Sequence, residues 1–297
     1  MSPTSHLSKF VVPVDKQLAV ARLTRVPVVS PAVAVLLLLS TGGVIVADVL
    51  ALTARLGLGW ACVINIVLMY WQFTVVHDAI HRSAAKNQTL NDWFGRIGIA
   101  TFAPHASLGL FRWAHVQHHR FTNGPRDPDM WLHGSWWSMP LRWMFLDIGY
   151  LFFVSRQSDR TARRHLRVTL ILTALTLAVC ATLVATGWGL ALLMLWVIPS
   201  RITFATVGFT FFYLPHVKDD VPAEQDVTLA TSMRLGREWL LTPLMQWHNY
   251  HLIHHLFPTM PAYRHSQVWS LLEPELRRRN LQIQHGFALR PDVHAGI

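Results

Sequence analysis

Four long apolar stretches constrain the fold of this chain more than any other feature of the sequence. A helix needs about 20 apolar residues to cross the hydrocarbon core of a bilayer, and a segment in lipid is helical unless it belongs to a closed barrel. Only 14% of the 297 residues are charged, compared with about 25% in a typical soluble protein. We therefore predict an all-α, multi-pass integral membrane protein with four transmembrane helices in two hairpins: residues 28–47, 58–76, 168–187 and 188–214.

The distribution of basic residues predicts which side of the membrane each loop faces. Of the 26 Lys and Arg residues, only Arg55 lies in the two loops that close the hairpins. Cytoplasmic loops are enriched in Lys and Arg, so both termini and the segment between the hairpins are predicted to be cytoplasmic. The net charge of +10 follows this topology, so we predict no binding to nucleic acid. We divide the chain into a cytoplasmic N-terminal arm, a membrane domain and a C-terminal tail: residues 1–27, 28–281 and 282–297.

The segment between the hairpins is predicted to lie at the membrane surface. Residues 97–110 are apolar but too few to cross a bilayer, which favours an interfacial or re-entrant segment. Residues 131–154 carry Arg142 and Asp147 among many aromatic side chains, which favours an amphipathic helix along the surface. A run of five arginines follows between residues 156 and 167. It is predicted to face anionic lipid head groups or an acidic electron carrier, or to be an ordinary solvated helix face.

Three histidine clusters lie on the predicted cytoplasmic side. The first has the pattern H-x-x-x-H, and the second and third share the pattern H-x-x-H-H. Positions i, i+3 and i+4 of a helix lie on one face, so each cluster can present its imidazoles to one point. With 17 histidines in the chain, one H-x-x-H-H run is expected by chance roughly 0.05 times, so two copies indicate a binding site. The clusters are His77 and His81; His115, His118 and His119; and His251, His254 and His255.

The number of histidines predicts two metal ions. Imidazole suits iron, copper, zinc and nickel, and His216, just past the fourth span, adds one more candidate ligand. A single structural zinc ion needs only four ligands. Cys62 and Cys180 lie in apolar runs and form no CxxC pair, so an iron–sulfur cluster is excluded and copper(I) is disfavoured. We therefore predict a histidine-rich cytoplasmic cap that holds two irons and uses dioxygen.

These clusters resemble the histidine boxes of the integral-membrane fatty acid desaturase/hydroxylase superfamily. The resemblance rests on HDAIH, HVQHH and HLIHH in this order, and on flanking runs similar to the family's TNxxxDPD and NYHxxHHLFP sequences. Asn123, Asp129 and Asn249 in these runs are candidates for orienting the histidine rings. The eight histidines of the three boxes are the predicted catalytic residues. The resemblance implies two non-haem irons with nine ligands: His77, His81, His115, His118, His119, His216, His251, His254 and His255.

The resemblance also implies an oxidoreductase that uses O2 to attack an unactivated C–H bond of a lipid. Electrons are expected from a separate ferredoxin- or cytochrome-type carrier, because the chain has no Rossmann glycine fingerprint, flavin motif or haem-binding segment. We predict desaturation of a fatty acyl chain. The first box is one residue shorter than in the acyl-CoA enzymes of the superfamily, which argues against an acyl-CoA substrate. Met130 stands where some relatives have a further histidine, so that position is not counted as a ligand.

Three alternatives stay open. The sequences around the boxes are also similar to bacterial carotenoid β-ring hydroxylases, so hydroxylation of a carotenoid is the first. The second is oxidative decarboxylation of a free fatty acid to a terminal alkene. The third, from another class, is a non-catalytic membrane metal-binding protein. A transporter would need polar residues through its spans, and these spans contain few.

Arg201 lies inside the fourth predicted span. A charge in the membrane is costly, so its side chain is expected to face the helix bundle or a watery cavity, or to snorkel to the surface. Two roles are consistent with this position. Arg201 could bind the carboxylate or head group of a substrate, or it could pair with a structural partner.

Overall fold

Four helices have the length and composition to cross a membrane, as the sequence predicts. They are α2 (Pro31–Leu52), α3 (Leu58–Ile80), α8 (Arg160–Ala185) and the composite helix Gly189–His216, which contains α9 (Gly189–Leu192) and α10 (Ile198–Val207). The structure, a computed structural model, describes residues 10–296. Residues 1–9 of the predicted N-terminal arm and residue 297 of the predicted tail lie outside the described residues.

The chain forms two compact units. The membrane unit comprises residues 27–115 and 131–209, and the C-terminal unit comprises residues 10–26, 116–130 and 210–296. The other helices of the membrane unit are α4 (Gln88–Phe102), α6 (Met139–Met144) and α7 (Leu146–Ser155). Those of the C-terminal unit are α1 (Gln17–Thr24), α11 (Glu238–Leu244), α12 (His251–Leu256) and α13 (His265–Leu276). Helix α5 (Leu108–Phe121) begins in the membrane unit, and its residues after His115 belong to the C-terminal unit.

The helix ends differ from the predicted spans because polar residues near them find partners. Asp48 accepts a hydrogen bond from Asn65 of α3 at 2.8 Å, and α2 continues past it to Leu52. Helix α8 begins at Arg160 instead of residue 168, because the side chain of Asp159 accepts a hydrogen bond from the Ala162 backbone and caps the helix. The basic run therefore forms the first turns of a long apolar helix.

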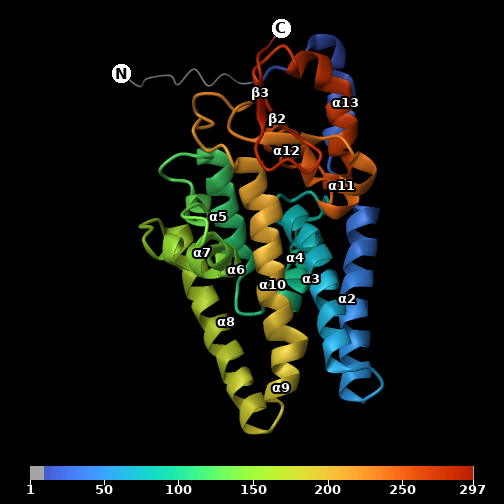
Figure 1. Ribbon diagram of the computed structural model, residues 1–297, viewed down its shortest axis with the longest axis vertical. Helices are drawn as coiled ribbons and strands as arrows, with labels where there is room; N and C mark the ends of the chain where they lie inside the picture. Colours follow the sequence, from blue (N-terminus) through green and yellow to red (C-terminus); the bar gives the residue numbers. More distant parts are fainter. Residues whose placement is uncertain (1–9, 297) are drawn as a thin grey trace. The chain divides into compact units, whose positions relative to one another are not determined.

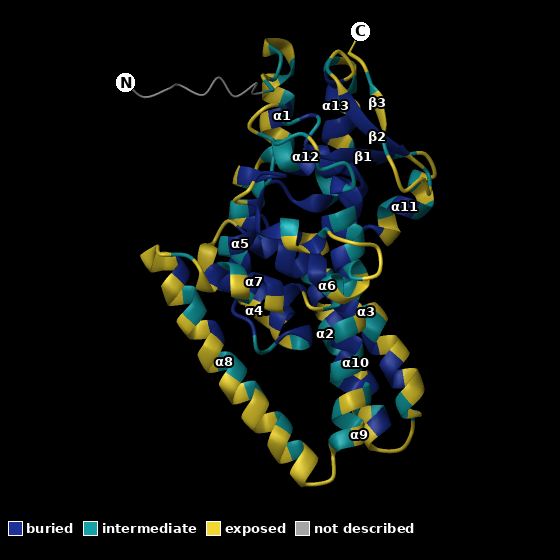
Figure 2. Ribbon diagram, turned by 60° about the vertical axis from the view of Figure 1, so that its left-hand side comes forward, coloured by how far each residue is buried: buried dark blue, intermediate teal, exposed yellow. Residues whose placement is uncertain are grey.

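Helix α3 is the central apolar helix of the membrane unit. Helices α2 and α10 pack against it (Figure 1). Its polar side chains pair with neighbouring helices: Gln72 with Ser40 of α2, and Asn65 with the Leu195 carbonyl at 2.9 Å. Such pairs hold helices together where lipid offers no hydrogen bonds. By contrast, only 6% of the most apolar window of α8 is buried, and Figure 2 shows exposed residues along almost all of this helix.

The predicted surface segments are divided differently by the structure. Residues 97–110 are not one segment but the end of α4 and the start of α5, separated by a turn. The turn begins at Ala103, which precedes Pro104, and a residue before proline disfavours the helical conformation. Residues 131–154 form two short helices, α6 and α7, which meet at Phe145, instead of one amphipathic helix.

The C-terminal unit contains a three-stranded sheet that the all-α prediction did not include. Strand β1 (Ser232–Leu235) pairs in parallel with β2 (Leu281–His285), and β2 pairs antiparallel with β3 (Asp292–His294). Apolar and polar residues alternate in β2, and its Leu281 and Ile283 are fully buried. They share a core with Val20 of α1 and Leu272 of α13. Strands this short carry too weak a pattern to be recognised in the sequence.

Arg201 pairs with a carboxylate of the protein itself. Its guanidinium donates two hydrogen bonds to Asp147 of α7, at 3.0 and 2.9 Å, and His105 lies 2.6 Å from the same carboxylate. Burial alone would raise the pKa of Asp147, but the bonds from His105 and Arg201 lower it below the usual value. The structure therefore gives Arg201 a structural partner within the protein, as the second of the two expected roles requires.

Candidate metal centre

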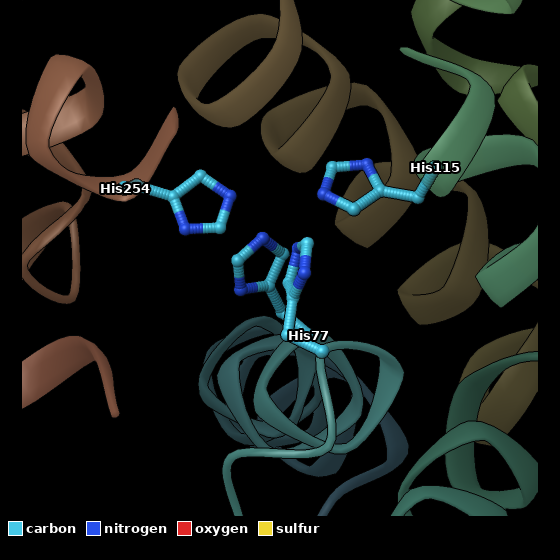
Figure 3. A group of neighbouring side chains, drawn as sticks. His77, His115 and His254 are labelled. Carbon is cyan, nitrogen blue, oxygen red and sulfur yellow. The ribbon is translucent and has the colours of Figure 1, made fainter. Parts of the chain in front are cut away.

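Three of the predicted histidines meet in the membrane unit. His77 and His81 stand one turn apart at the end of α3, and His115 comes from α5. The ring centroids lie 4.7, 5.0 and 4.8 Å apart, and nitrogens of the three rings lie within 4.8 Å of one another. Figure 3 shows His77 and His115 extending from α3 and α5 toward a common point. All three side chains are buried, so water is largely excluded from this group.

Arg112 fixes the position of α5 against the end of α3. Its guanidinium donates hydrogen bonds to the carbonyls of Ala79 and Ile80, at 2.8 and 3.1 Å. These are among the last carbonyls of α3, which have no partner within the helix. Because Arg112 precedes His115 by one turn, this bond brings His115 to the histidines of α3.

Six further predicted histidines lie in the C-terminal unit, and four of them form one group. Ligand nitrogens of the four all lie within 4.8 Å of one another. The Nε2 atom of His251 lies 3.1 Å from Nε2 of His216 and 3.1 Å from Nε2 of His255. The members of this four-histidine group are His118, His216, His251 and His255.

The hydrogen bonds of the group determine which ring nitrogens are free to bind a metal. Nδ1 of His216 lies 3.0 Å from the Ala230 carbonyl, which only accepts, so Nδ1 carries the proton and Nε2 keeps its lone pair. Burial, followed by the neighbouring histidines, lowers the pKa of both His251 and His255, so these rings are neutral. Two lone pairs at such distances repel one another, so either a ring proton or a metal cation lies between the nitrogens. Two nitrogens that each bind one metal at about 2.1 Å are about 3.0–3.4 Å apart, so the spacing in this group fits a metal ion.

His118 is held by two carboxylates. Its Nδ1 lies 3.0 Å from Asp127 and 3.1 Å from Asp129. Burial would lower the pKa of His118, but these carboxylates outweigh it and raise the pKa to about 9. A carboxylate that holds the Nδ1 proton leaves Nε2 as the metal-binding atom. Asp129 was among the residues expected to orient a histidine, whereas Asp127, two residues earlier in the same DPD run, was not singled out.

The two asparagines expected beside the histidines bind backbone carbonyls. Asn123 donates to the carbonyls of Val221 and Ala230, at 3.1 and 2.8 Å. The Ala230 carbonyl is also the partner of His216, so Asn123 orients that ring through it. Asn249 lies 3.4 Å from the Arg234 carbonyl. The structure therefore supports an indirect orienting role for Asn123 and gives Asn249 a backbone partner.

His119 and His254 form a pair, and two histidines that were not predicted lie beside it. The Nε2 atoms of His119 and His254 are 2.9 Å apart. The rings of His248 and His265 lie 5.7 and 5.6 Å from that of His254. Burial lowers the pKa of His248 to about 3 and that of His265 to about 4, so both are neutral. The position of His248, three residues before His251, is the only sequence signal that points to either of these two additional histidines.

Comparison with known proteins identifies the family. Residues 54–287 match the family model described as fatty acid desaturase. The chain belongs to the fatty acid desaturase family. This membership confirms the resemblance of the histidine boxes, and the four apolar helices support an integral membrane protein.

Individual known proteins are similar to this chain at low identity. A β-carotene ketolase from Paracoccus sp. is 28% identical, over 73% of this chain and 78% of its own length. A fatty acid desaturase from Bacillus subtilis is 25% identical, over 65% of this chain and 61% of its own length. An sn-1 acyl-lipid omega-3 desaturase (ferredoxin) from Synechocystis sp. is 23% identical, over 70% of this chain and 65% of its own length. The chain thus spans less than two thirds of these two desaturases.

Proposed function

We propose that this protein is an O2-dependent membrane oxidoreductase with two non-haem irons, and that it desaturates a fatty acyl chain. The four-histidine group carries the proposal. Ring nitrogens of its four imidazoles lie within 4.8 Å of one another, burial favours the neutral form of His251 and His255, and the donor set, all nitrogen, suits iron. The names of the Bacillus subtilis and Synechocystis relatives support a fatty acyl substrate.

The side chains of this protein hold and orient the metals. We propose that the four-histidine group binds one iron and that all nine predicted histidines serve as ligands of the two. Asp127 would hold the proton at Nδ1 of His118, and the Ala230 carbonyl would do so for His216. When bound, the two irons would supply the activation of dioxygen and the cleavage of the C–H bond, which no side chain can perform. The burial of the histidines limits the access of water.

The electron donor and the orientation are proposed from charge and similarity. The donor is a separate ferredoxin- or cytochrome-type carrier, in line with the word ferredoxin in the name of the Synechocystis relative. The histidines and both termini are proposed to face the cytoplasm, because the basic residues lie on that side of the predicted hairpins. The division into residues 1–27, 28–281 and 282–297 stays a prediction.

Oxygenation of a carotenoid ring is the second candidate function. The observation that favours it is the similarity to the β-carotene ketolase, whose length is covered to 78%, compared with 61% and 65% for the two desaturases. Hydroxylation of a β-ring, predicted from the sequence, belongs to this class. Neither decarboxylation nor a non-catalytic metal-binding role has a comparable observation in its favour.

Mass spectrometry of total lipids distinguishes these functions. The protein is expressed in a host that makes both fatty acids and carotenoids, with His118→Ala as the inactive variant. His285→Ala on β2, an exposed histidine outside the groups above, is the matched control. Acyl chains that lose two hydrogens with the wild type and His285→Ala, but not with His118→Ala, are the expected result. An oxygenated carotenoid with the same dependence would instead establish the second candidate. Wild-type lipids identical to those of His118→Ala, with two irons bound and electrons delivered, would refute both.

A further inference from the structure

A pocket of about 480 Å³ lies in the membrane unit and is lined by none of the predicted histidines. It is enclosed by α4, by α5 with the turn before it, and by the first turns of α8. Pockets that bind small molecules have volumes of about 300–1,000 Å³. The pocket is therefore large enough for a ligand.

The walls of the pocket change from charged to apolar along two of its helices. On α8 the lining residues Arg164, Val168 and Leu172 are four apart, so they follow one face of the helix over about 12 Å. On α4 the lining changes in the same chain direction from Arg96 to Ile99. Each of these walls thus offers a cation at one end and hydrocarbon at the other.

Contacts with α5 show that the charged ends of the two walls coincide. Arg112 of α5 forms an ion pair with Asp92 of α4 at 2.5 Å, at the charged end. Just before α5, the hydroxyl of Ser107 lies 2.9 Å from the hydroxyl of Thr169 on α8. Thr169 follows His165 by one turn of that helix, in the direction of the apolar residues. The chain from Arg112 back to Ser107, just before α5, therefore runs from the charged ends of the α4 and α8 walls toward their apolar ends. The pocket is amphipathic.

The charged end has more cations than its own carboxylate can neutralise. Asp92 is the only acidic residue in the lining, and Arg112 binds both of its oxygens, at 2.5 and 3.4 Å. Arg96 and Arg164 are exposed, and neither forms an ion pair in the part of the chain that the structure describes, although the charge of Arg96 helps to lower the pKa of Asp92. The face of Trp93 lies 5.5 Å from the Arg96 guanidinium and does not neutralise its charge. Arginine is well suited to carboxylate and phosphate oxygens, so the missing anion is expected from a ligand.

We propose that this pocket binds an anionic amphiphile. A carboxylate or phosphate head group would lie at Arg96 and Arg164, and the adjoining hydrocarbon along Ile99, Val168 and Leu172. The change from basic to apolar residues within α8 is typical of the depth at which lipid head groups lie, which favours an amphiphile over a soluble anion. The head group could come from a free fatty acid or from a phospholipid of the bilayer. This inference concerns binding and does not depend on the reaction proposed above.

Native mass spectrometry of the full-length protein in a neutral detergent tests the proposal. The probes are oleate, dioleoyl phosphatidylglycerol and inorganic phosphate. Arg96→Gln and Arg164→Gln each remove one unpaired cation, and Arg163→Gln removes an exposed neighbour that does not line the pocket. We expect each lining variant to weaken the binding of a lipid probe by about tenfold, because each loses one charge-assisted hydrogen bond. Arg163→Gln should bind as the wild type does.

The three probes distinguish the possible sources of the ligand. If the lining variants bind only oleate more weakly, the ligand is a free fatty acid. If they bind only phosphatidylglycerol more weakly, the ligand is a bilayer lipid. Weaker binding of both probes shows that the pocket recognises the charge of either head group. Ala100→Phe, which narrows the apolar end of the pocket, should weaken the binding of the two lipid probes but not the binding of phosphate. Lipid binding that is unchanged in both lining variants, or reduced equally in Arg163→Gln, would overturn the proposal. Inorganic phosphate bound as tightly as the lipids would overturn the role of the hydrocarbon.

Discussion

At the scale of single residues, Asp127 has the clearest influence on the metal centre. Besides His118, its carboxylate accepts hydrogen bonds from the backbone N–H groups of Asn123 and Asp129, at 2.8 and 2.9 Å. These bonds hold the carboxylate still, and it in turn holds the imidazole of His118. Groups that fix the ring and the protonated nitrogen of a ligand histidine typically change metal affinity. The same residue therefore links the fold of the DPD loop to the histidines.

Replacing Asp127 by Asn should weaken metal binding without removing a ligand. An amide in place of the carboxylate attracts the Nδ1 proton of His118 less strongly, so the ring loses its preferred orientation and tautomer. We expect metal affinity to fall by about 10–100-fold, measured by titration of the metal-free protein with Fe(II) or Zn(II). Asp220→Asn, an exposed acid near Lys218, is the control. Equal affinities in the two variants would show that Asp127 does not support the site.

Breaking the ion pair between Arg201 and Asp147 is expected to lower the stability of the folded protein. Arg201→Gln leaves the buried carboxylate of Asp147 with His105 as its remaining partner, and breaking a buried pair from one side costs about 3–5 kcal/mol. The double variant with Asp147→Asn should recover part of this loss, which thermal unfolding in detergent would measure. A double variant no more stable than Arg201→Gln would exclude direct coupling.

The contribution of Asp147 also predicts a dependence on pH. Against the effect of burial, the hydrogen bonds from His105 and Arg201 hold the pKa of Asp147 in the folded protein below the ordinary value of an aspartate. The stabilisation is therefore fully present above about pH 4 and is lost as the pH falls through the folded pKa. In Asp147→Asn this acid-dependent part of the stability should be absent. An unchanged acid dependence of the midpoint would assign it to other carboxylates.

At the scale of elements, the close approach of α10 and α6 depends on one glycine. A Cβ at Gly208, just after α10, would lie 2.7 Å from Cβ and 2.9 Å from Cα of Trp143 in α6. Gly208→Ala should therefore force the helices apart and cost about 1–3 kcal/mol. Gly42→Ala in α2 is the matched control, because nothing lies within 4 Å of its Cβ. In thermal unfolding, the midpoint temperature of Gly42→Ala should equal or exceed that of the wild type. Equal destabilisation of the two variants would contradict the tight contact at Gly208.

At the scale of the whole molecule, the predicted membrane topology rests on the distribution of charged residues. In a background without Cys62 and Cys180, single cysteines at Arg55 and at Arg156 report the two sides of the membrane. A membrane-impermeant maleimide added to intact cells should label Arg55→Cys and spare Arg156→Cys, because the basic segment is predicted to be cytoplasmic. Disrupted cells should allow both to react. The reverse pattern in intact cells would place the histidines outside.

Much of this protein could be predicted from local sequence patterns. The four apolar helices follow from runs of apolar residues, and the eight histidines of the three boxes follow from their spacing, because helix periodicity puts the members of each box on one face. The predictions missed the breaks between helices and the short strands. The turn at Ala103 and the pairing of β1 with β2 depend on a proline and on residues far away in the chain, which outweigh the local apolar pattern.

The sequence by itself determined the class of the protein, since composition predicts membrane helices and the spacing of the histidines predicts a metal site. Tertiary structure alone decided the partners. Asn123 reaches Ala230 across 107 positions, and Arg201 reaches Asp147 across 54, and no local pattern specifies which distant group will satisfy a buried polar atom. The protonated nitrogen of His216 and the amphipathic pocket between α4, α5 and α8 were decided in the same way. Most buried polar groups have a hydrogen-bond partner, and the fold decides which one.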